Sequence, residues 1–211
     1  MGWRYRRLFL LCRRVRPNEH AYRVLTMDSR KTTLDTPFDQ RQLRNALGRF
    51  PTGVTVITTR GPGGKLEGMT ANSFSALSLD PPLVLWSISR KALSLPSFIE
   101  SGHFCINVLP AAHIDISHRF ATPRENKYDG VTFESGIGGS PVLSDALATF
   151  ECRTETTLDA GDHLLFIGRA QRISFRDGEP LVFSAGQYCT ALPLRKGHAA
   201  SDLKDIWEGL G

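Results

Sequence analysis

The stretch 68-GMTANSFSALSLDPPLVLWSISRK-91 joins a polar half to a strongly apolar half. Its first part is rich in small hydroxyl and amide side chains, among them Thr70, Asn72 and Ser73. After the Pro-Pro pair, residues 83–88 form an almost continuous apolar run, which is typical of a buried strand. The stretch therefore predicts a polar segment that a turn at Asp80-Pro81-Pro82 brings back onto a core strand.

Strand and turn signals continue on both sides of this stretch. Residues 53–59 (GVTVITT) are rich in β-branched residues and predict a strand. The Gly-rich residues 61–68 predict a turn that would fold this strand into a hairpin. Further strand-like runs are residues 104–109, 131–134, 147–158, 164–175 and 181–188. Segments long enough to be crossover helices are few, so the pattern favours a mainly β, antiparallel barrel over a doubly wound parallel sheet.

Three short segments have helical character. Thr36-Pro37 is a helix start signal, and Pro51 would end that helix. Its apolar residues recur at helical spacing and predict one apolar face, made of Leu43, Ala46, Leu47 and Phe50. The other two segments are residues 94–101 and 112–121. In the last one we expect three residues to point inward: Ile114, Ile116 and Phe120.

The basic character of the chain is concentrated at its N-terminus. The 211 residues have a net charge of +5, but residues 1–26 carry seven Arg and one Glu, so the remaining residues sum to −1. A nucleic-acid-binding face belongs to the folded domain, so this distribution argues against nucleic acid as a partner. We expect a basic extension at residues 1–32 outside the domain, one domain at residues 33–192 and a tail at residues 193–211.

The sequence lacks the motifs of several protein classes, which disfavours those classes. No apolar run approaches the roughly 20 residues that a membrane-spanning helix needs. The four cysteines form no CxxC pair, which disfavours a disulfide framework or a zinc site, and we expect a cytoplasmic protein without a metal. There is also no dinucleotide fingerprint, P-loop, nucleophile elbow or HExxH motif.

The polar segment itself has two interpretations from its residues alone. Its hydroxyl and amide groups could line a pocket for a polar aromatic ring, with Arg90 and Lys91 neutralising a phosphate and Ser89 as a further donor. The segment could equally be a solvated hairpin that happens to carry two surface cations. Composition does not decide between them.

Several ordered blocks of the sequence resemble the flavin reductase-like family. They are 50-FPTGVTVITT-59, 68-GMTANSFSALSLDPPLVLWSIS-89, 104-FCINVL-109, 161-GDHLLFIGR-169 and 181-LVFSAGQY-188. This family contains the short-chain NAD(P)H:flavin oxidoreductases that serve as reductase components of two-component flavin-dependent monooxygenases. The resemblance covers residues 38–192 and implies a split-barrel flavin-binding fold of the antiparallel Greek-key type, usually a homodimer with flavin near the subunit interface.

The resemblance also implies ligands and site residues. The ligands are FMN or FAD, with NADH or NADPH as hydride donor. The expected flavin-binding residues fall in three blocks: Pro51, Thr52, Gly53 and Val54; Thr70, Ala71, Asn72, Ser73 and Phe74; and Ser89, Arg90 and Lys91. The expected nicotinamide site consists of His163, which would position the ring for catalysis, Tyr188 and, with a weaker match, His118.

This reading predicts a reductase that transfers a hydride to flavin and releases the reduced flavin to a separate monooxygenase. Three alternatives stay open from the sequence: a non-enzymatic flavin-binding module, another FMN-dependent split-barrel oxidoreductase, and a β-barrel that binds some other small ligand. The sequence does not decide between FMN and FAD or between NADH and NADPH, and it does not identify the partner.

Overall fold

The structure, a computed structural model, describes residues 39–192. The predicted extension at residues 1–32, its Thr36-Pro37 helix start and the predicted tail at residues 193–211 lie outside the described residues. The chain divides into two units, residues 1–44 and residues 45–211, and the account below concerns the second of them. The described residues contain no helix that is both long and apolar enough to cross a membrane.

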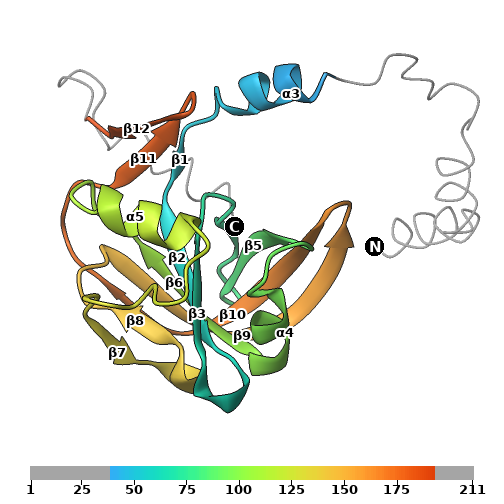
Figure 1. Ribbon diagram of the computed structural model, residues 1–211, viewed down its shortest axis with the longest axis vertical. Helices are drawn as coiled ribbons and strands as arrows, with labels where there is room; N and C mark the ends of the chain where they lie inside the picture. Colours follow the sequence, from blue (N-terminus) through green and yellow to red (C-terminus); the bar gives the residue numbers. More distant parts are fainter. Residues whose placement is uncertain (1–38, 193–211) are drawn as a thin grey trace, which may run out of the picture. The chain divides into compact units, whose positions relative to one another are not determined.

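The second unit is built on antiparallel sheets, as the sequence predicts (Figure 1). The main sheet has the strand order β3-β2-β6-β9-β10-β5-β4. Its strands are β2 (Thr55–Arg60), β3 (Leu66–Ala71), β4 (Ser75–Ser78), β5 (Leu83–Ser89), β6 (His103–Val108), β9 (Ala148–Ala160) and β10 (His163–Phe175). Within residues 39–192, β3 and β4 remain at the two ends of this sheet, so it does not close into a barrel.

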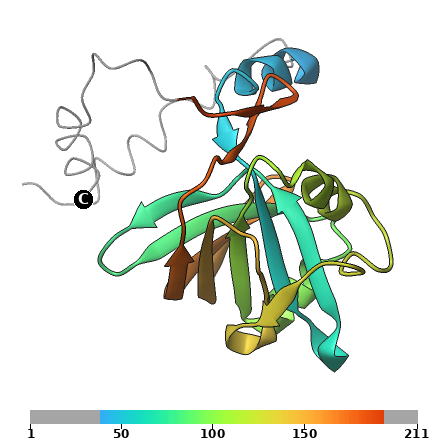
Figure 2. The same ribbon diagram turned by 90° about the vertical axis from the view of Figure 1, so that its left-hand side faces the viewer.

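The described residues also contain smaller elements (Figure 2). A three-stranded sheet contains β1 (Thr52–Gly53), β11 (Leu181–Ser184) and β12 (Gln187–Thr190), and a two-stranded sheet contains β7 (Phe133–Ser135) and β8 (Pro141–Leu143). The helices are α3 (Gln40–Leu47), α4 (Leu95–Ser101) and α5 (Ile114–Ala121), with short 3-10 turns η2 (Pro62–Gly64) and η3 (Ile137–Gly139).

The two hairpins expected around the opening stretch are present. Strand β2 pairs with β3 through the Gly-rich turn, in which Gly63 has a φ of 66° and therefore uses the left-handed region open to glycine. Strand β4 pairs with β5 beyond the Asp80-Pro81-Pro82 turn. The polar half and the core strand of the opening stretch are thus neighbours in the same sheet.

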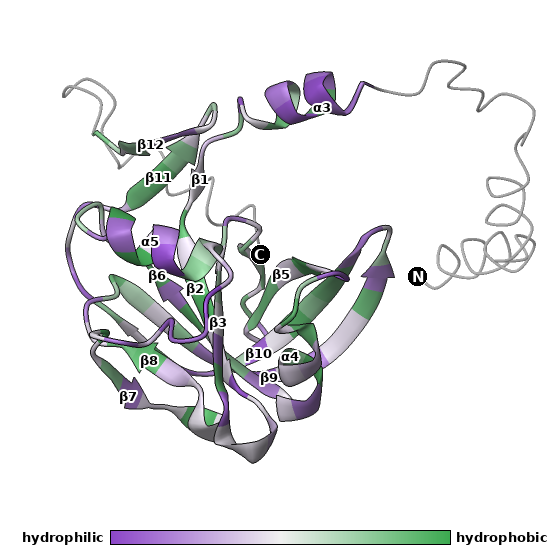
Figure 3. Ribbon diagram, in the orientation of Figure 1, coloured by the Kyte–Doolittle hydropathy of each residue, from purple (hydrophilic) through white to green (hydrophobic). Residues whose placement is uncertain are grey.

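Strand β5 is buried on one face only, which corrects the expectation of a continuously buried run. Burial alternates along the strand. The buried residues are Val84, Trp86 and Ile88, and the half-buried ones are Leu83, Leu85, Ser87 and Ser89. Successive side chains of a strand point to opposite faces, so the apolar run 83–88 supplies both a core face and a second, more accessible face. Figure 3 shows the hydrophobic colouring along β5.

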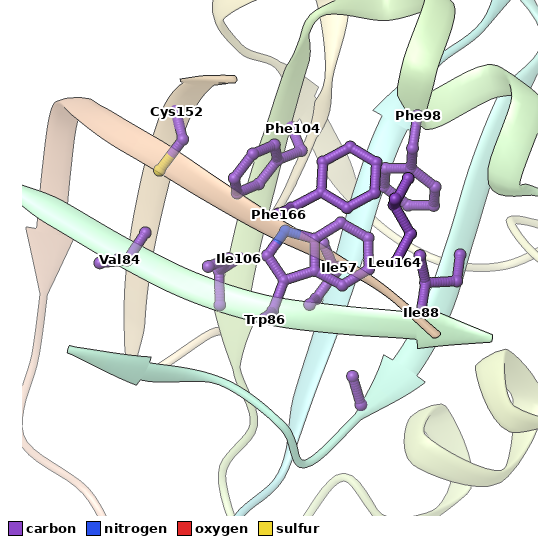
Figure 4. Packing of buried hydrophobic residues seen from close by; sticks show 11 residues of the cluster. Ile57, Val84, Trp86, Ile88, Phe98, Phe104, Ile106, Cys152, Leu164 and Phe166 are labelled. Carbon is purple, nitrogen blue, oxygen red and sulfur yellow. The ribbon is translucent and has the colours of Figure 1, made fainter. Parts of the chain in front are cut away.

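The core face of β5 packs an aromatic cluster (Figure 4). Trp86 stacks on Phe166 with ring centroids 4.8 Å apart, and the edges of Phe98 and Phe104 meet it at 4.9 Å and 5.6 Å. A second cluster lies on the other face of β2, where Val56 packs with residues such as Leu109, Phe120 and Leu181. The main sheet is therefore covered on both faces around β2.

Some sequence expectations are wrong in detail. Residues 181–188 form the hairpin β11–β12 rather than one strand, turned by Ala185 and Gly186 at positive φ. The short strand expected at residues 131–134 is β7 at Phe133–Ser135, and the helix expected to begin at residue 112 is α5, which begins at Ile114. Ile114 is 40% exposed instead of inward, while Phe120 is buried as expected. No residue of α3 is buried, so the predicted apolar face of that helix is not covered.

Candidate functional site

The accessible face of β5 meets β10 at a group of polar side chains. Ser89 lies opposite His163, and Ser87 lies opposite Leu165, in the antiparallel β5–β10 register. Directly opposed residues share one face of a sheet, so Ser87, Ser89 and His163 lie on the face away from Trp86 and its core cluster. The same strands that build the core thus carry the candidate site on their other side.

The loop after β3 is attached to the backbone of β5 by Ser73, along the edge that pairs with β4. Its Oγ accepts a hydrogen bond from the Ser87 amide at 3.0 Å and donates to the Ser87 carbonyl at 3.1 Å. The neighbouring Asn72 is exposed, and its Nδ2 donates to Thr52 Oγ1 at 3.2 Å. The structure therefore brings together the first two predicted flavin-binding blocks, although they are separated in sequence.

The predicted residues of these two blocks differ in which of their atoms a ligand can reach. Pro51 and Gly53 are exposed, and a Cβ added to Gly53 would meet nothing within 4 Å. Val54 and Ala71 are buried at 2% and 8% exposure, and Phe74 packs on the ring of Phe150 with centroids 5.3 Å apart. The side chains of Val54, Ala71 and Phe74 therefore serve the core, which leaves mainly their backbone groups for a ligand.

The third block, at the end of β5, contains two cations with different surroundings. Arg90 forms an ion pair with Asp159 and donates from Nε to the Gly161 carbonyl at 3.3 Å, so it ties the end of β5 to the β9–β10 turn. Lys91 is exposed and has no ion-pair partner among residues 39–192. Lys91 is the cation more readily available to a phosphate, because Arg90 would first have to leave its exposed and therefore weak ion pair.

His163 is oriented by the residue before it. Its Nδ1 lies 2.7 Å from Asp162 Oδ1, and the hydrogen bond from His163 lowers the pKa of Asp162 below its ordinary value. Because a carboxylate only accepts hydrogen bonds, Nδ1 is the donor in this pair. The Nε2 atom of the half-buried His163 ring is left for a ligand.

The Asp162–His163 pair gives a pH prediction. A lowered pKa means that the stabilisation from ionised Asp162 is complete above its ordinary pKa of 3.8 and is lost as the pH falls through the lowered value. Because the resemblance places the nicotinamide at His163, we expect Asp162→Asn to raise the KM for the nicotinamide donor roughly two- to fivefold, and equally at every pH above about 4. Steady-state kinetics across pH measures this; a penalty that disappears near neutral pH would contradict the role of the carboxylate.

A second group of predicted residues gathers around Ser117 of α5. The hydroxyl of Thr70 donates to the Ser117 carbonyl at 2.6 Å, and Ser117 Oγ lies 2.8 Å from the hydroxyl of Tyr188. The ring of the exposed His118 meets the ring of Tyr188 edge-on with centroids 5.2 Å apart. Ser117 thus links a predicted flavin residue to the predicted nicotinamide residue Tyr188.

Sequence reasoning missed Ser117, although its side chain is fully buried. The available signal was its position three residues before the buried Phe120, which places a polar side chain on the inward face of α5. His163 and Tyr188 make no hydrogen bond or ring contact with each other in the described part of the chain. The predicted nicotinamide residues therefore belong to two separate groups.

Ser117→Ala tests this link. Removing the hydroxyl frees the Tyr188 ring. Because the resemblance places Tyr188 at the nicotinamide site, we expect a rise of about fivefold in the KM for the nicotinamide donor, from the loss of one hydrogen bond of about 1 kcal/mol. Tyr188→Phe removes the same bond from the other side and is the matched variant. The double variant is expected to raise the KM for the donor no more than either single variant does. Fully additive increases in this KM would show that the two hydroxyls act independently.

A cavity of about 620 Å³ lies beside the second group. Its lining comes from Lys65 and β3, from the residues after Lys91, and from the end of α5 and the segment that follows it; it includes Met69, Thr70, Leu93, Phe120 and Arg124. Thr70 is the predicted site residue that lines this cavity. The 39–192 part of the chain contains no cluster of three or more side chains suited to hold a metal ion.

Comparison with known families decides what this arrangement belongs to. Residues 47–192 match the flavin reductase like domain. The chain belongs to this family. It is 47% identical over 172 residues to FMN reductase (NADH) SmoA from Agrobacterium fabrum, covering 82% of this chain and 91% of that protein. The chain spans only 52% of the length of a probable flavin reductase from Rhizobium meliloti, to which it is 41% identical.

Solved structures agree with the family. The flavin reductase PheA2 is 42% identical, with a TM-score of 0.67 over 74% of this chain and 99% of that one. NADH:FAD oxidoreductase SgcE6 from Streptomyces globisporus, in complex with NAD and FAD fragments, is 34% identical, with a TM-score of 0.72 over 76% of this chain and 98% of that one. The predictions of a flavin reductase-like oxidoreductase, of flavin with a nicotinamide donor, and of a mainly β antiparallel fold are confirmed.

Proposed function

We propose that this flavin reductase holds the ring of FMN or FAD against the loop at residues 70–74 and takes the hydride from NADH or NADPH beside His163. The observation that supports this placement is the attachment of Ser73 to the backbone of Ser87, which holds the loop at residues 70–74 beside β5. Next to Ser73 in the chain, Asn72 donates a hydrogen bond to Thr52, and two residues beyond Ser87, Ser89 lies opposite His163.

The groups around the loop at residues 70–74 and at the end of β5 fit a flavin. The amide of Asn72 offers both a donor and an acceptor, which suits the carbonyl and N–H edge of the ring. The open space above Gly53 leaves room for a flat group close to the backbone. At the end of β5, Lys91 and the hydroxyl of Ser89 supply a charge and a donor for the ribityl phosphate.

The bound flavin and the nicotinamide supply the redox chemistry, a hydride transfer between two rings, so the chain needs no nucleophile of its own. The chain's contribution is position and charge. Asn72 and the backbone around it orient the flavin edge, and Lys91 offsets the phosphate charge. His163, held by Asp162, offers Nε2 to the carboxamide of the nicotinamide.

Four further features belong to this proposal. The open main sheet and the smaller sheets together form a split barrel of the Greek-key type, and the protein works as a homodimer. Large apolar side chains that are exposed in a single chain support the dimer: Leu77, Leu79, Leu158, Ile173 and Phe175.

The enzyme is placed in the cytoplasm. Free thiols are usual in that compartment, and Cys105, Cys152 and Cys189 are free. The reduced flavin passes to a separate monooxygenase; relatives include the trigonelline monooxygenase reductase component of Acinetobacter baylyi.

A steady-state assay tests the proposed function. Purified protein supplied with FMN or FAD is expected to oxidise NADH or NADPH, seen as a fall in the nicotinamide absorbance that depends on added flavin. Retained flavin without turnover would instead favour the non-enzymatic binding module. Absence of turnover with both donors and both flavins would contradict the reductase. Light scattering on the same sample tests the dimer, and a monomeric mass would contradict it.

A further inference from the structure

The hydroxyl of Thr55 is buried at the beginning of β2, where it reaches the end of β3. Thr55 is 1% exposed, and its Oγ1 donates a hydrogen bond to the carbonyl of Ala71 at 2.8 Å. The two residues also face each other in the β2–β3 register. Ala71 is the last residue of β3, so this bond fixes the chain where the strand passes into the loop.

A second anchor holds the same loop two residues later. Ser73 Oγ accepts a hydrogen bond from the Ser87 amide at 3.0 Å and donates to the Ser87 carbonyl at 3.1 Å. Asn72 is exposed and lies between the two anchors. Within residues 39–192 its main-chain amide, which follows the last residue of β3, makes no backbone hydrogen bond. This N–H group is therefore fixed in position while the protein leaves it unused.

The direction of the Asn72 amide follows from the bond between Thr55 and Ala71. The carbonyl of Ala71 and the N–H of Asn72 belong to one trans peptide unit. In a planar trans peptide these two groups point in opposite directions. Because the carbonyl points to the buried Thr55 hydroxyl, the N–H of Asn72 points away from Thr55 and is left for a ligand.

We propose that Thr55 is a positioning residue for the flavin. Its hydroxyl holds the Ala71 carbonyl inward and so aims the main-chain N–H of Asn72 at an acceptor atom of the flavin ring. The inference rests on the proposed function, because that function places the ring against the loop at residues 70–74. Thr55 itself does not touch the ligand. A donor that is already fixed before the ligand arrives does not have to be ordered on binding.

This role has a consequence that depends on the redox state of the flavin. Reduction adds electrons to the ring, and near neutral pH the reduced ring carries a negative charge. A hydrogen bond to a charged acceptor is roughly twice as strong as one to a neutral acceptor. A correctly aimed N–H therefore stabilises bound reduced flavin more than bound oxidised flavin. A residue that only supported the sheet would change both affinities equally.

Thr55→Val tests the proposal, because valine keeps the shape of the side chain and removes the hydroxyl. We expect the variant to weaken binding of oxidised FMN about threefold and binding of reduced FMN about tenfold. The KM for the nicotinamide donor should stay unchanged. Equilibrium titration with FMN, in air and under anaerobic reducing conditions, measures the two affinities. Thr55→Ser restores a hydroxyl and is expected to recover most of both.

Thr59→Val is the matched control on the same strand. Thr59 is fully buried, and its Oγ1 donates to the His103 carbonyl at 2.7 Å, toward the other end of β2. We expect this variant to lower the urea midpoint of unfolding about as much as Thr55→Val does and to leave both FMN affinities unchanged. Equal losses of FMN affinity in the two variants would overturn the proposal. Equal weakening of oxidised and reduced FMN by Thr55→Val would overturn it as well.

Asn72→Ala separates this inference from the proposed placement of the flavin. The variant removes the side-chain amide and keeps the main-chain N–H. A loss of FMN affinity in Asn72→Ala with none in Thr55→Val would overturn the role of Thr55 and leave the placement standing. Unchanged FMN affinity in both variants would contradict the placement of the ring at this loop, and the inference would fail with it.

Discussion

Trp86→Ala is expected to lower the free energy of unfolding by about 3 to 5 kcal/mol, the largest effect on stability that we predict. Trp86 is fully buried and is packed against Phe98, Phe104 and Phe166. Its removal leaves a cavity that these rings cannot fill without moving. Strand β5 carries Ser87 and Ser89 on its other face, so the variant should also weaken flavin binding.

Trp86→Phe is the matched control for this prediction. The indole Nε1 has no hydrogen-bond partner in the structure, so replacing the indole with a phenyl ring loses volume but no polar interaction. We expect a much smaller loss of stability, about 1 to 2 kcal/mol. Urea unfolding measures both variants. Equal losses for the two substitutions would contradict a role based on packing.

His163→Ala is expected to lower kcat/KM for the nicotinamide donor about tenfold, through loss of one ligand hydrogen bond of about 1.5 kcal/mol. The affinity for flavin should stay unchanged, because the flavin contacts that we propose lie on Asn72, Ser89 and Lys91. His163→Gln offers an amide in place of Nε2 and is expected to recover part of the activity.

His113→Ala is the control for this second prediction, since His113 lines a separate small cavity away from β10. Steady-state kinetics with varied donor and a flavin titration measure the two effects separately. Unchanged kinetics for His163→Ala would remove this residue from the donor site. A parallel loss of flavin affinity would assign it to the flavin instead.

The fold was largely predictable because strand and turn chemistry are local. The β2–β3 and β4–β5 hairpins follow from glycine and proline turns that act over a few residues. The β11–β12 hairpin was not predictable in this way, because its turn places Ala185 at positive φ, where Asn or Gly is usual. The one-sided burial of β5 was also missed, since an apolar run does not reveal which of its faces is covered.

The site residues assigned from the sequence blocks stay predictions, and their geometry could not be derived from the sequence. Thr52 and Asn72 meet through a side-chain hydrogen bond between β1 and the loop after β3, and Ser89 and His163 face each other because β5 pairs with β10. Ser117 escaped notice because its role depends on tertiary contacts with Thr70 and Tyr188. Arg90 looked like a free cation in the sequence, and its pairing with Asp159 depends on where the β9–β10 turn lies.

The most direct test of the site is a crystal structure of the enzyme with bound flavin and oxidised nicotinamide dinucleotide. The account predicts the flavin ring within hydrogen-bond distance of the loop at residues 70–74. It predicts the ribityl phosphate beside Ser89 and Lys91, and the nicotinamide carboxamide at His163 Nε2. A flavin ring bound away from that loop, with His163 facing no ligand, would contradict it.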